Sequence, residues 1–158
     1  MPPLSVLRDD GALGELRPLV LALRDHHAAV APEFGPVRDD DACWVMTRDR
    51  YARALAAGDG ALFVARGAGG PPLGFAFASA AAPSPDWPTV AVVVEDIAVA
   101  ADARGAGLGA GLLAAVRAHA GDRELRLSVL EANHGARRFY AREGFVGLAR
   151  ELVLLRDH

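Results

Sequence analysis

One segment constrains the fold of this chain more than any other. It consists of a β-branched run at residues 89–100, a glycine-rich turn at 104–111 and an apolar helical pattern that starts within the turn. The run TVAVVVEDIAVA has the composition of a strand. The apolar positions of the helical pattern are Leu108, Leu112, Ala115 and Val116. A strand, a tight turn and a helix in this order predict a mixed α/β domain.

The remaining elements surround this segment. Strands are predicted at 4–8, 61–66, 73–79, 89–100 and 123–130, with a last strand or strand pair at 145–156. Helices are predicted at 15–30, from a cap at Thr47 to Gly58, after the glycine turn, and from a cap at Asn133 to Glu143. The sheet should be parallel only near its centre. With 158 residues and no linker, residues 1–158 are expected to form a single domain.

Composition excludes several classes of function. All 17 Lys and Arg residues are arginine, which excludes lysine Schiff-base chemistry and the phosphate-binding GK[ST] loop. A net charge of −3 gives no basic surface for nucleic acid, and no basic amphipathic helix for membranes is found. No metal-ligand spacing is present, and Cys43 alone cannot form a disulfide framework. Because the start lacks a signal-peptide pattern, a cytoplasmic location is expected.

The glycine-rich turn is suited to bind an anion. Gly105, Gly107 and Gly109 lack a Cβ atom, so the chain can turn tightly and expose its N–H groups. Those amides lie at the start of the predicted helix, where unpaired donors and the helix dipole favour a pyrophosphate. Arg104 can add a guanidinium fork. The structural alternative is a turn that only packs the helix close to the strand.

A second motif lies downstream, where Asn133 and Tyr140 are seven residues apart on one helix face. Together the two segments resemble the GNAT superfamily of N-acetyltransferases over about residues 89–146. The cofactor signature of that family, Arg or Gln-x-x-Gly-x-Gly or Ala, is matched by Arg104, Gly107 and Gly109. Its downstream signature is matched by Asn133, Ala136, Phe139, Tyr140, Gly144 and Phe145.

The resemblance implies a fold and a cosubstrate. The fold would be a mixed, mostly antiparallel sheet with a central, splayed parallel pair and flanking helices. Acetyl-CoA would lie between the splayed strands, with no metal involved, and a homodimer is expected. The pantetheine arm would pair as a pseudo-strand with Ile97, Ala98 and Val99, and Asn133 would bond it while also capping a helix. The pyrophosphate would be held beside Arg104 by the amides of Gly105, Ala106, Gly107, Leu108, Gly109 and Ala110.

Direct acetyl transfer needs a neutral amine and a stabilised leaving thiolate. The EDI segment resembles that of diamine acetyltransferases, which makes Glu95 the predicted general base. Asp96 should point to the opposite face unless a bulge shifts the register. Tyr140 is the predicted acid, acting as a hydrogen-bond donor to the sulfur. The structural alternatives are a salt-bridged Glu95 and a Tyr140 ring that only packs in the core.

One subtype of the family and one rival fold are compared with this chain at particular residues. Family members that acetylate ribosomal protein N-termini carry a glutamate five residues before the Asn, where this chain has Ser128. The segment Gly105-x-Gly107-x-x-Ala110 also fits a dinucleotide fingerprint, with Glu131 about 20 residues on. Against that oxidoreductase reading, residues 100–104 separate the turn from its strand.

The sequence therefore predicts transfer of acetyl from acetyl-CoA to the primary amine of a small molecule, either a polyamine or an amino-acid-like amine. The alternative is a noncatalytic acyl-CoA-binding sensor or partner protein. The acidic residues Asp39, Asp40 and Asp41 could suit a cationic acceptor, although a solvated loop explains them as well.

Overall fold

Residues 3–156 are described by the structure, a computed structural model, and their five strands form one sheet in the order β1-β2-β3-β4-β5. Neighbouring strands are antiparallel except β4 and β5, which are parallel. The strands are β1 (Ser5–Arg8), β2 (Gly60–Arg66), β3 (Gly74–Ala80), β4 (Ala91–Val99) and β5 (Glu124–Arg126). The mixed α/β prediction is confirmed.

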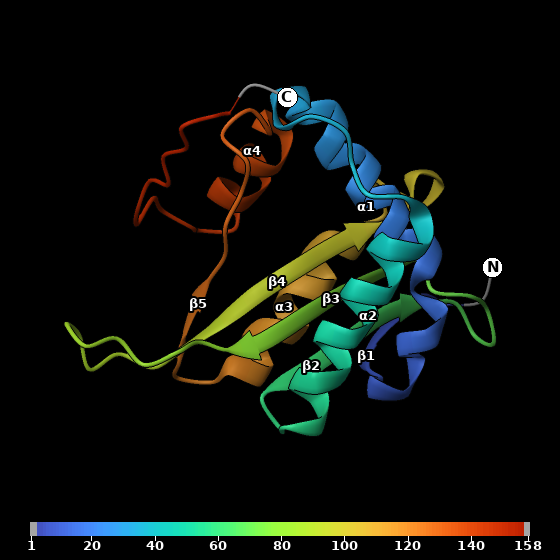
Figure 1. Ribbon diagram of the computed structural model, residues 1–158. Coiled ribbons are helices and arrows are strands. Elements are labelled where there is room, and N and C mark those ends of the chain that lie inside the picture. The colour runs from blue at the N-terminus through green and yellow to red at the C-terminus, as the bar shows by residue number, and fades with distance from the viewer. Residues whose placement is uncertain (1–2, 157–158) are drawn as a thin grey trace.

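Helices cover both faces of the sheet (Figure 1), with α1 and α2 on one face and α3 on the other. The α-helices are α1 (Arg17–Val30), α2 (Asp40–Ala56), α3 (Leu108–Ala120) and α4 (His134–Arg142). Short 3-10 turns are η1 (Asp10–Glu15), η2 (Pro32–Phe34) and η3 (Ala101–Ala103). Within the described range no helix has the length and apolarity that a membrane span requires.

The two central strands β2 and β3 are apolar on both faces because each face is covered. Phe63 and its alternate neighbours pack against α3, whereas Leu62 and Val64 pack toward α1 and α2. Successive side chains of a strand point to opposite faces, so an uninterrupted apolar run fills two separate cores. The sheet thus lies between two helical layers, and β5 is the strand at its edge.

The parallel pair separates after a short contact. Pairing joins Ala91, Val92 and Val93 of β4 to residues 124–126 of β5, and β4 then continues alone on that side to Val99. This geometry confirms the splayed parallel pair that the sequence predicted. It leaves backbone groups of the second half of β4 free for another chain or a ligand.

A β-bulge interrupts the pairing of β3 with β4. Phe77 pairs with Asp96 and Ala78 pairs with Val94, so Glu95 is the extra residue. A bulge breaks the strict alternation of faces. As a result Glu95 and Asp96 both reach the same guanidinium, that of Arg50 in α2. Asp96 was expected to point to the opposite face from Glu95 unless a bulge shifted the register. The structure has that bulge, so the exception applies.

The second helix begins earlier than the sequence predicted. Asp39, not Thr47, is its N-cap, and the Asp39 carboxylate accepts the N–H of Ala42 at 2.8 Å. Thr47 lies inside the helix instead. An Asp at the N-cap satisfies one orphan donor, and two further acidic residues in the first turn favour the helix dipole. The acidic run was read as a loop because the helical apolar pattern starts only after it.

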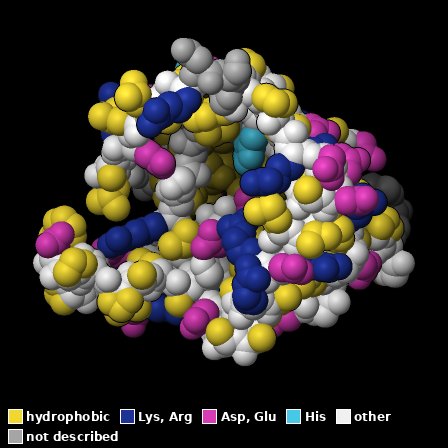
Figure 2. Space-filling view, viewed as in Figure 1, with side chains coloured by type: hydrophobic (Ala, Val, Ile, Leu, Met, Phe, Trp, Pro, Cys, Tyr) yellow, Lys and Arg dark blue, Asp and Glu magenta, His cyan; other side chains and the backbone are white. Residues whose placement is uncertain are grey.

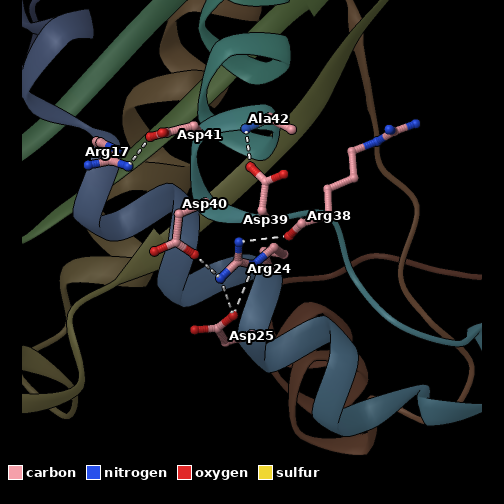
Figure 3. A network of polar contacts seen from close by, with 8 residues as sticks. All are labelled: Arg17, Arg24, Asp25, Arg38, Asp39, Asp40, Asp41 and Ala42. Atoms are coloured by element: carbon pink, nitrogen blue, oxygen red, sulfur yellow. Dashed lines mark hydrogen bonds and ion pairs between the residues drawn. The ribbon is translucent and has the colours of Figure 1, made fainter.

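The same acidic residues are ion-paired to α1 (Figure 3). Asp41 pairs with Arg17 at 2.7 Å, and Asp40 pairs with Arg24 at 2.8 Å. Arg24 also pairs with Asp25 and donates to the carbonyl of Arg38. These contacts fix α2 against α1, so the acidic run serves the helix start and the helix pair.

The predicted strand or strand pair at 145–156 is wrong, because the structure shows no strand there. The predicted strand at 123–130 also shortens to Glu124–Arg126. A strand needs a partner edge, and β5, the edge strand of the sheet, is only three residues long, so it offers little backbone for pairing. The segment runs beside α4 instead (Figure 1). Its exposed large side chains are Val146, Leu148, Leu152, Val153, Leu154 and Leu155.

Candidate active site

The glycine-rich turn presents free amides at the start of α3. Gly105 and Gly107 have φ of 84° and 78°, and a Cβ at either position would meet no atom within 4 Å. Residues with side chains avoid that region, so these positions require glycine for conformation rather than for space. The first helical hydrogen bond runs from Gly111 N–H to Gly107 O at 3.0 Å. Within the described chain, the amides of residues 105–110 have no protein acceptor, which is the arrangement that anions occupy.

Arg104 and Leu108 frame the turn in different ways. Arg104 is exposed, and its Nε donates to Val99 O at 3.4 Å, which leaves its terminal nitrogens open. Leu108 is buried in the core with α3, so it contributes an amide to the turn but no side chain. The buried leucine anchors the helix start, and the guanidinium adds positive charge beside the free amides.

The free edge of β4 carries the backbone groups predicted to pair with a cofactor arm. Ala100 N–H donates toward β3, to Leu73 O, at 2.8 Å. Because successive residues of a strand alternate, Ala98 also faces β3. The backbone groups of Ile97 and Val99 therefore face the open side, where β5 has separated. Both lie next to the glycine turn in sequence and belong to the same edge.

The helix α4 closes the other side of this opening. Asn133 is its N-cap, with Oδ1 accepting the N–H of Ala136 at 3.2 Å, and its Nδ2 lies 3.3 Å from Nε2 of His26 in α1. The cap prediction for Asn133 is confirmed. The Phe139 ring would lie 3.5 Å from a Cβ on Gly109. That distance is an ordinary van der Waals contact, so the Phe139 ring of α4 lies beside the first turn of α3 with room for a Cβ atom.

Tyr140 is half-buried between two aromatic rings. Its centroid lies 5.2 Å from that of Phe139 and 5.7 Å from that of Phe145. Burial, together with the charge of Asp96, raises the pKa of Tyr140 to about 12. At neutral pH the phenol is protonated, so its O–H can donate a hydrogen bond.

The two carboxylates of the bulge differ in environment. Glu95 accepts hydrogen bonds from Ser79 and Arg50. The side chain of Asp96, 18% exposed, accepts from Arg50 at 2.9 Å and from the hydroxyl of the fully buried Tyr51. Burial raises the pKa of Asp96, while the Tyr51 hydrogen bond and the charge of Arg50 oppose that shift. The net effect is a pKa of Asp96 above its ordinary value, because burial outweighs these two contacts.

Asp96 opens into a cavity of about 250 Å³ between α1, α2 and β4. Its lining residues are Val20, Leu23, Arg24, His27, Val37, Cys43, Thr47, Arg50, Tyr51 and Asp96. Figure 2 shows a separate hollow between the α4 side of the molecule and α1, with hydrophobic side chains at its floor and a His at its rim. Desolvation lowers the pKa of His27, opposed by the charge of Asp96, so the imidazole is neutral at pH 7.

Two residues of this cavity were missed from the sequence. Arg50 and Tyr51 were placed in a helix, but neither was given a functional role. Their contacts with β4 span more than 40 positions in the chain, and no local pattern reports such a pairing. The only available signal was an aromatic and a cation side by side in the predicted helix.

The dinucleotide reading does not fit this geometry. The turn η3 stands between β4 and the glycine turn, whereas the fingerprint turn follows its strand directly. The sheet is mostly antiparallel, which differs from the doubly wound parallel sheet of that class. Within the described residues, no group of three or more His, Cys, Asp or Glu side chains is arranged to hold a metal ion.

Comparisons with known proteins agree with the motifs. The family model described as "Acetyltransferase (GNAT) domain" matches residues 58–147, more than half of the chain. A search among curated proteins finds no match.

Solved structures with the same fold cover nearly the whole chain. A tetramutant of the BH1408 protein from Bacillus halodurans has a TM-score of 0.80 at 15% identity, over 96% of this chain and 99% of that one. Aminoglycoside N-acetyltransferase AAC(6')-Iy in complex with CoA gives 0.69 at 22%, over 99% and 96%. Ribosomal-protein-alanine N-acetyltransferase from Brucella melitensis biovar Abortus 2308 gives 0.67 at 18%, over 97% and 99%. At these identities the likeness shows a shared fold.

Proposed function

This chain belongs to the GNAT family of acetyltransferases, and from that premise we propose that it moves the acetyl group of acetyl-CoA directly to a primary amine of a small molecule. One observation carries the proposal. The amides of residues 105–110 have no protein acceptor within the described chain, and they lie at the start of α3, close in sequence to the open edge of β4 and beside Phe139 of α4. We propose that residues 1–158 act as one domain, as a cytoplasmic homodimer.

Acetyl-CoA enters this proposal as a cosubstrate held by backbone. Its pyrophosphate accepts hydrogen bonds from the amides of residues 105–110, and Arg104 adds charge. Its pantetheine arm pairs with Ile97 and Val99 on the edge that β5 leaves open. Asn133 contributes its Nδ2 group once the contact with His26 is released. The solved aminoglycoside acetyltransferase in complex with CoA supports a cosubstrate of this kind for the fold.

The amine must lose a proton before it attacks. A primary alkyl amine has a pKa of about 10.4 by analogy with lysine, so it arrives mostly charged. The sequence predicted Glu95 as the base, but the cavity favours Asp96, which lines it and has the raised pKa. We therefore assign the proton to Asp96, with Glu95 holding Arg50 beside it. General bases of this kind typically contribute about 10²–10⁴-fold in rate.

Tyr140 supports the departure of the thiolate. A nitrogen–carbon bond forms, the carbon–sulfur bond breaks, and the proton that the amine loses balances the one that the free thiol gains. With a tyrosine pKa of about 12 against about 8.5 for a thiol, full donation by the phenol is uphill by roughly 5 kcal/mol. Tyr140 therefore stabilises the sulfur through a hydrogen bond, and the former ammonium supplies the net proton.

An acceptor screen that follows free thiol release tests the function. The panel contains polyamines, amino acids, aminoglycosides and peptides, each with acetyl-CoA. Turnover with a small primary amine is expected. Tight acetyl-CoA binding by calorimetry without turnover on any amine would favour the alternative, a noncatalytic acyl-CoA sensor, because binding needs neither Asp96 nor Tyr140.

Replacing Tyr51 with Phe is expected to move the acidic limb of the pH profile of kcat/KM to higher pH. The Tyr51 hydroxyl lowers the pKa of Asp96 by donating to its carboxylate. Without that donor the pKa of Asp96 rises further, so the ionised base is lost at a higher pH as the solution is acidified. The ring stays and keeps its stacking on Phe77, 3.9 Å between centroids.

The profile is measured by thiol release between pH 5 and pH 9 under acetyl-CoA saturation. Folding is checked by circular dichroism at each pH. An acidic limb that stays in place in the folded variant would show that a group other than Asp96 titrates there.

A further inference from the structure

We propose, resting on the function above, that the acceptor is a small amine that also carries a carboxylate and an apolar side chain, as a free hydrophobic amino acid does, and that Arg50 reads the carboxylate. The amine meets Asp96, the carboxylate meets Arg50, and the apolar part fills the rest of the cavity. The proposal makes Arg50 a specificity-determining residue.

The first argument is the lining of the cavity. Its apolar lining comes from Val20 and Leu23 of α1 and from Val37, although α1 also contributes Arg24 and His27. Asp96 and Arg50, which are ion-paired to each other, supply the two charges of the proposed subsite. A volume of about 250 Å³ lies below the ~300–1,000 Å³ of drug-sized ligand pockets. The cavity thus suits a ligand the size of an amino acid with one apolar end and one zwitterionic end.

The second argument is the donor count of Arg50. A guanidinium has five N–H donors. One terminal nitrogen donates to Glu95 at 3.1 Å and the other to Asp96 at 2.9 Å. Within the described chain Nε makes no hydrogen bond, and the side chain is 49% exposed. Nε–H and one N–H of each terminal nitrogen therefore remain to donate. Nε and an adjacent terminal nitrogen can use these hydrogens as the free fork that binds a carboxylate with two parallel bonds.

The third argument is charge. An ammonium placed against Asp96 also lies close to Arg50, which repels it. A carboxylate on the same molecule turns that repulsion into an attraction, whereas a second ammonium adds to it. Of the other ionisable groups at the cavity, His27 is neutral at pH 7 and Arg24 is held between Asp25 and Asp40. The pair of Asp96 and Arg50 is thus complementary to a zwitterion rather than to a polycation.

The fourth argument concerns the acidic run, which the sequence suggested as a site for a cationic amine. Asp39 caps α2, and Asp40 and Asp41 are ion-paired with arginines of α1. Their charges are compensated by these contacts. No free acidic surface from this run reaches the lining of the cavity, so the observation that favoured polyamines loses its basis.

The experiment compares L-leucine with two matched amines, L-leucinamide and 3-methylbutylamine, and with spermidine. Rates of thiol release are compared at equal concentrations of the neutral amine. The wild-type kcat/KM should favour leucine over each by about ten-fold or more, because only leucine offers a carboxylate to the free fork. Arg50→Gln should remove this preference, because kcat/KM should fall about ten-fold more for leucine than for 3-methylbutylamine, and Arg50→Lys should restore the preference in part.

Arg53→Gln is the matched control, because Arg53 is exposed one turn further along α2 and does not line the cavity. It should keep the wild-type preference. Equal or better use of an amine without a carboxylate by the wild type would overturn the proposal. An equal loss on all amines in Arg50→Gln would also overturn it, since Arg50 would then only hold Asp96 in place.

A binding measurement separates this proposal from the proposed function. Calorimetry of L-leucine and of 3-methylbutylamine is run on the protein saturated with CoA. If no amine is acetylated, the proposed function fails, yet leucine binding that is lost in Arg50→Gln still supports the reading of the carboxylate. Leucine affinity that is unchanged in Arg50→Gln contradicts it, whatever the turnover.

Discussion

Replacing Tyr140 with Phe is expected to lower kcat by about 10²–10³-fold, the typical cost of removing one preorganised donor from a developing charge. The variant keeps the ring, so the packing against Phe139 and Phe145 is retained. It removes only the hydroxyl, whose pKa of about 12 keeps it protonated throughout the working range. Because the donor acts on the leaving thiolate and not on the bound cosubstrate, the affinity for acetyl-CoA should be unchanged.

The measurement combines steady-state thiol release with calorimetry of acetyl-CoA on the same protein. A Phe variant that loses cosubstrate affinity in proportion to its rate would indicate a damaged site rather than a lost donor. An unchanged kcat would remove Tyr140 from the reaction and leave it as a packing residue.

Replacing Gly107 with Asp is expected to raise the Kd for acetyl-CoA by about 100-fold or more. At φ of 78° a side chain costs roughly 1–2 kcal/mol of backbone strain. The new carboxylate also lies at the helix start, where it competes for the free amides and repels a pyrophosphate. Strain and repulsion act in the same direction, so this substitution should produce the largest loss of binding of any single change in the turn.

Gly58→Asp is the matched control for this prediction. Gly58 follows α2 with φ of 76°, and a Cβ there also meets no atom within 4 Å. The variant at position 58 should lose at least as much thermal stability, because its carboxylate lies beyond the C-terminus of α2, but only the variant at position 107 should lose affinity for acetyl-CoA. A similar fall in affinity in both would show that destabilisation, and not the anion site, accounts for the effect.

Local features of the fold were predictable from the sequence. The glycine turn, the cap at Asn133 and the β-branched run of β4 each depend on neighbouring residues, so their patterns report the structure directly. The separation of β4 and β5 came from the family resemblance, and the three paired positions are in accord with it. The strands at β2 and β3 were predicted as well, whereas the division of their side chains between two cores is seen only in the structure.

The chemistry of the cavity was less accessible. The bulge at Glu95 depends on how β3 pairs with β4, and pairing partners are not visible in a single strand. The contacts of Arg50 and Tyr51 with Asp96 join α2 to β4 across more than 40 positions of the chain. The segment 145–156 was misjudged because its local apolar pattern favours a strand, whereas a strand also requires pairing with a neighbour, which the structure does not show there.

The most direct measurement is a crystal structure of the protein with bound coenzyme A. The account predicts that the diphosphate accepts hydrogen bonds from main-chain amides between Gly105 and Ala110, and that the sulfur lies within hydrogen-bonding distance of the Tyr140 hydroxyl. A coenzyme bound elsewhere, with these amides facing only solvent, would contradict the account, as would an adenine dinucleotide occupying the turn in its place.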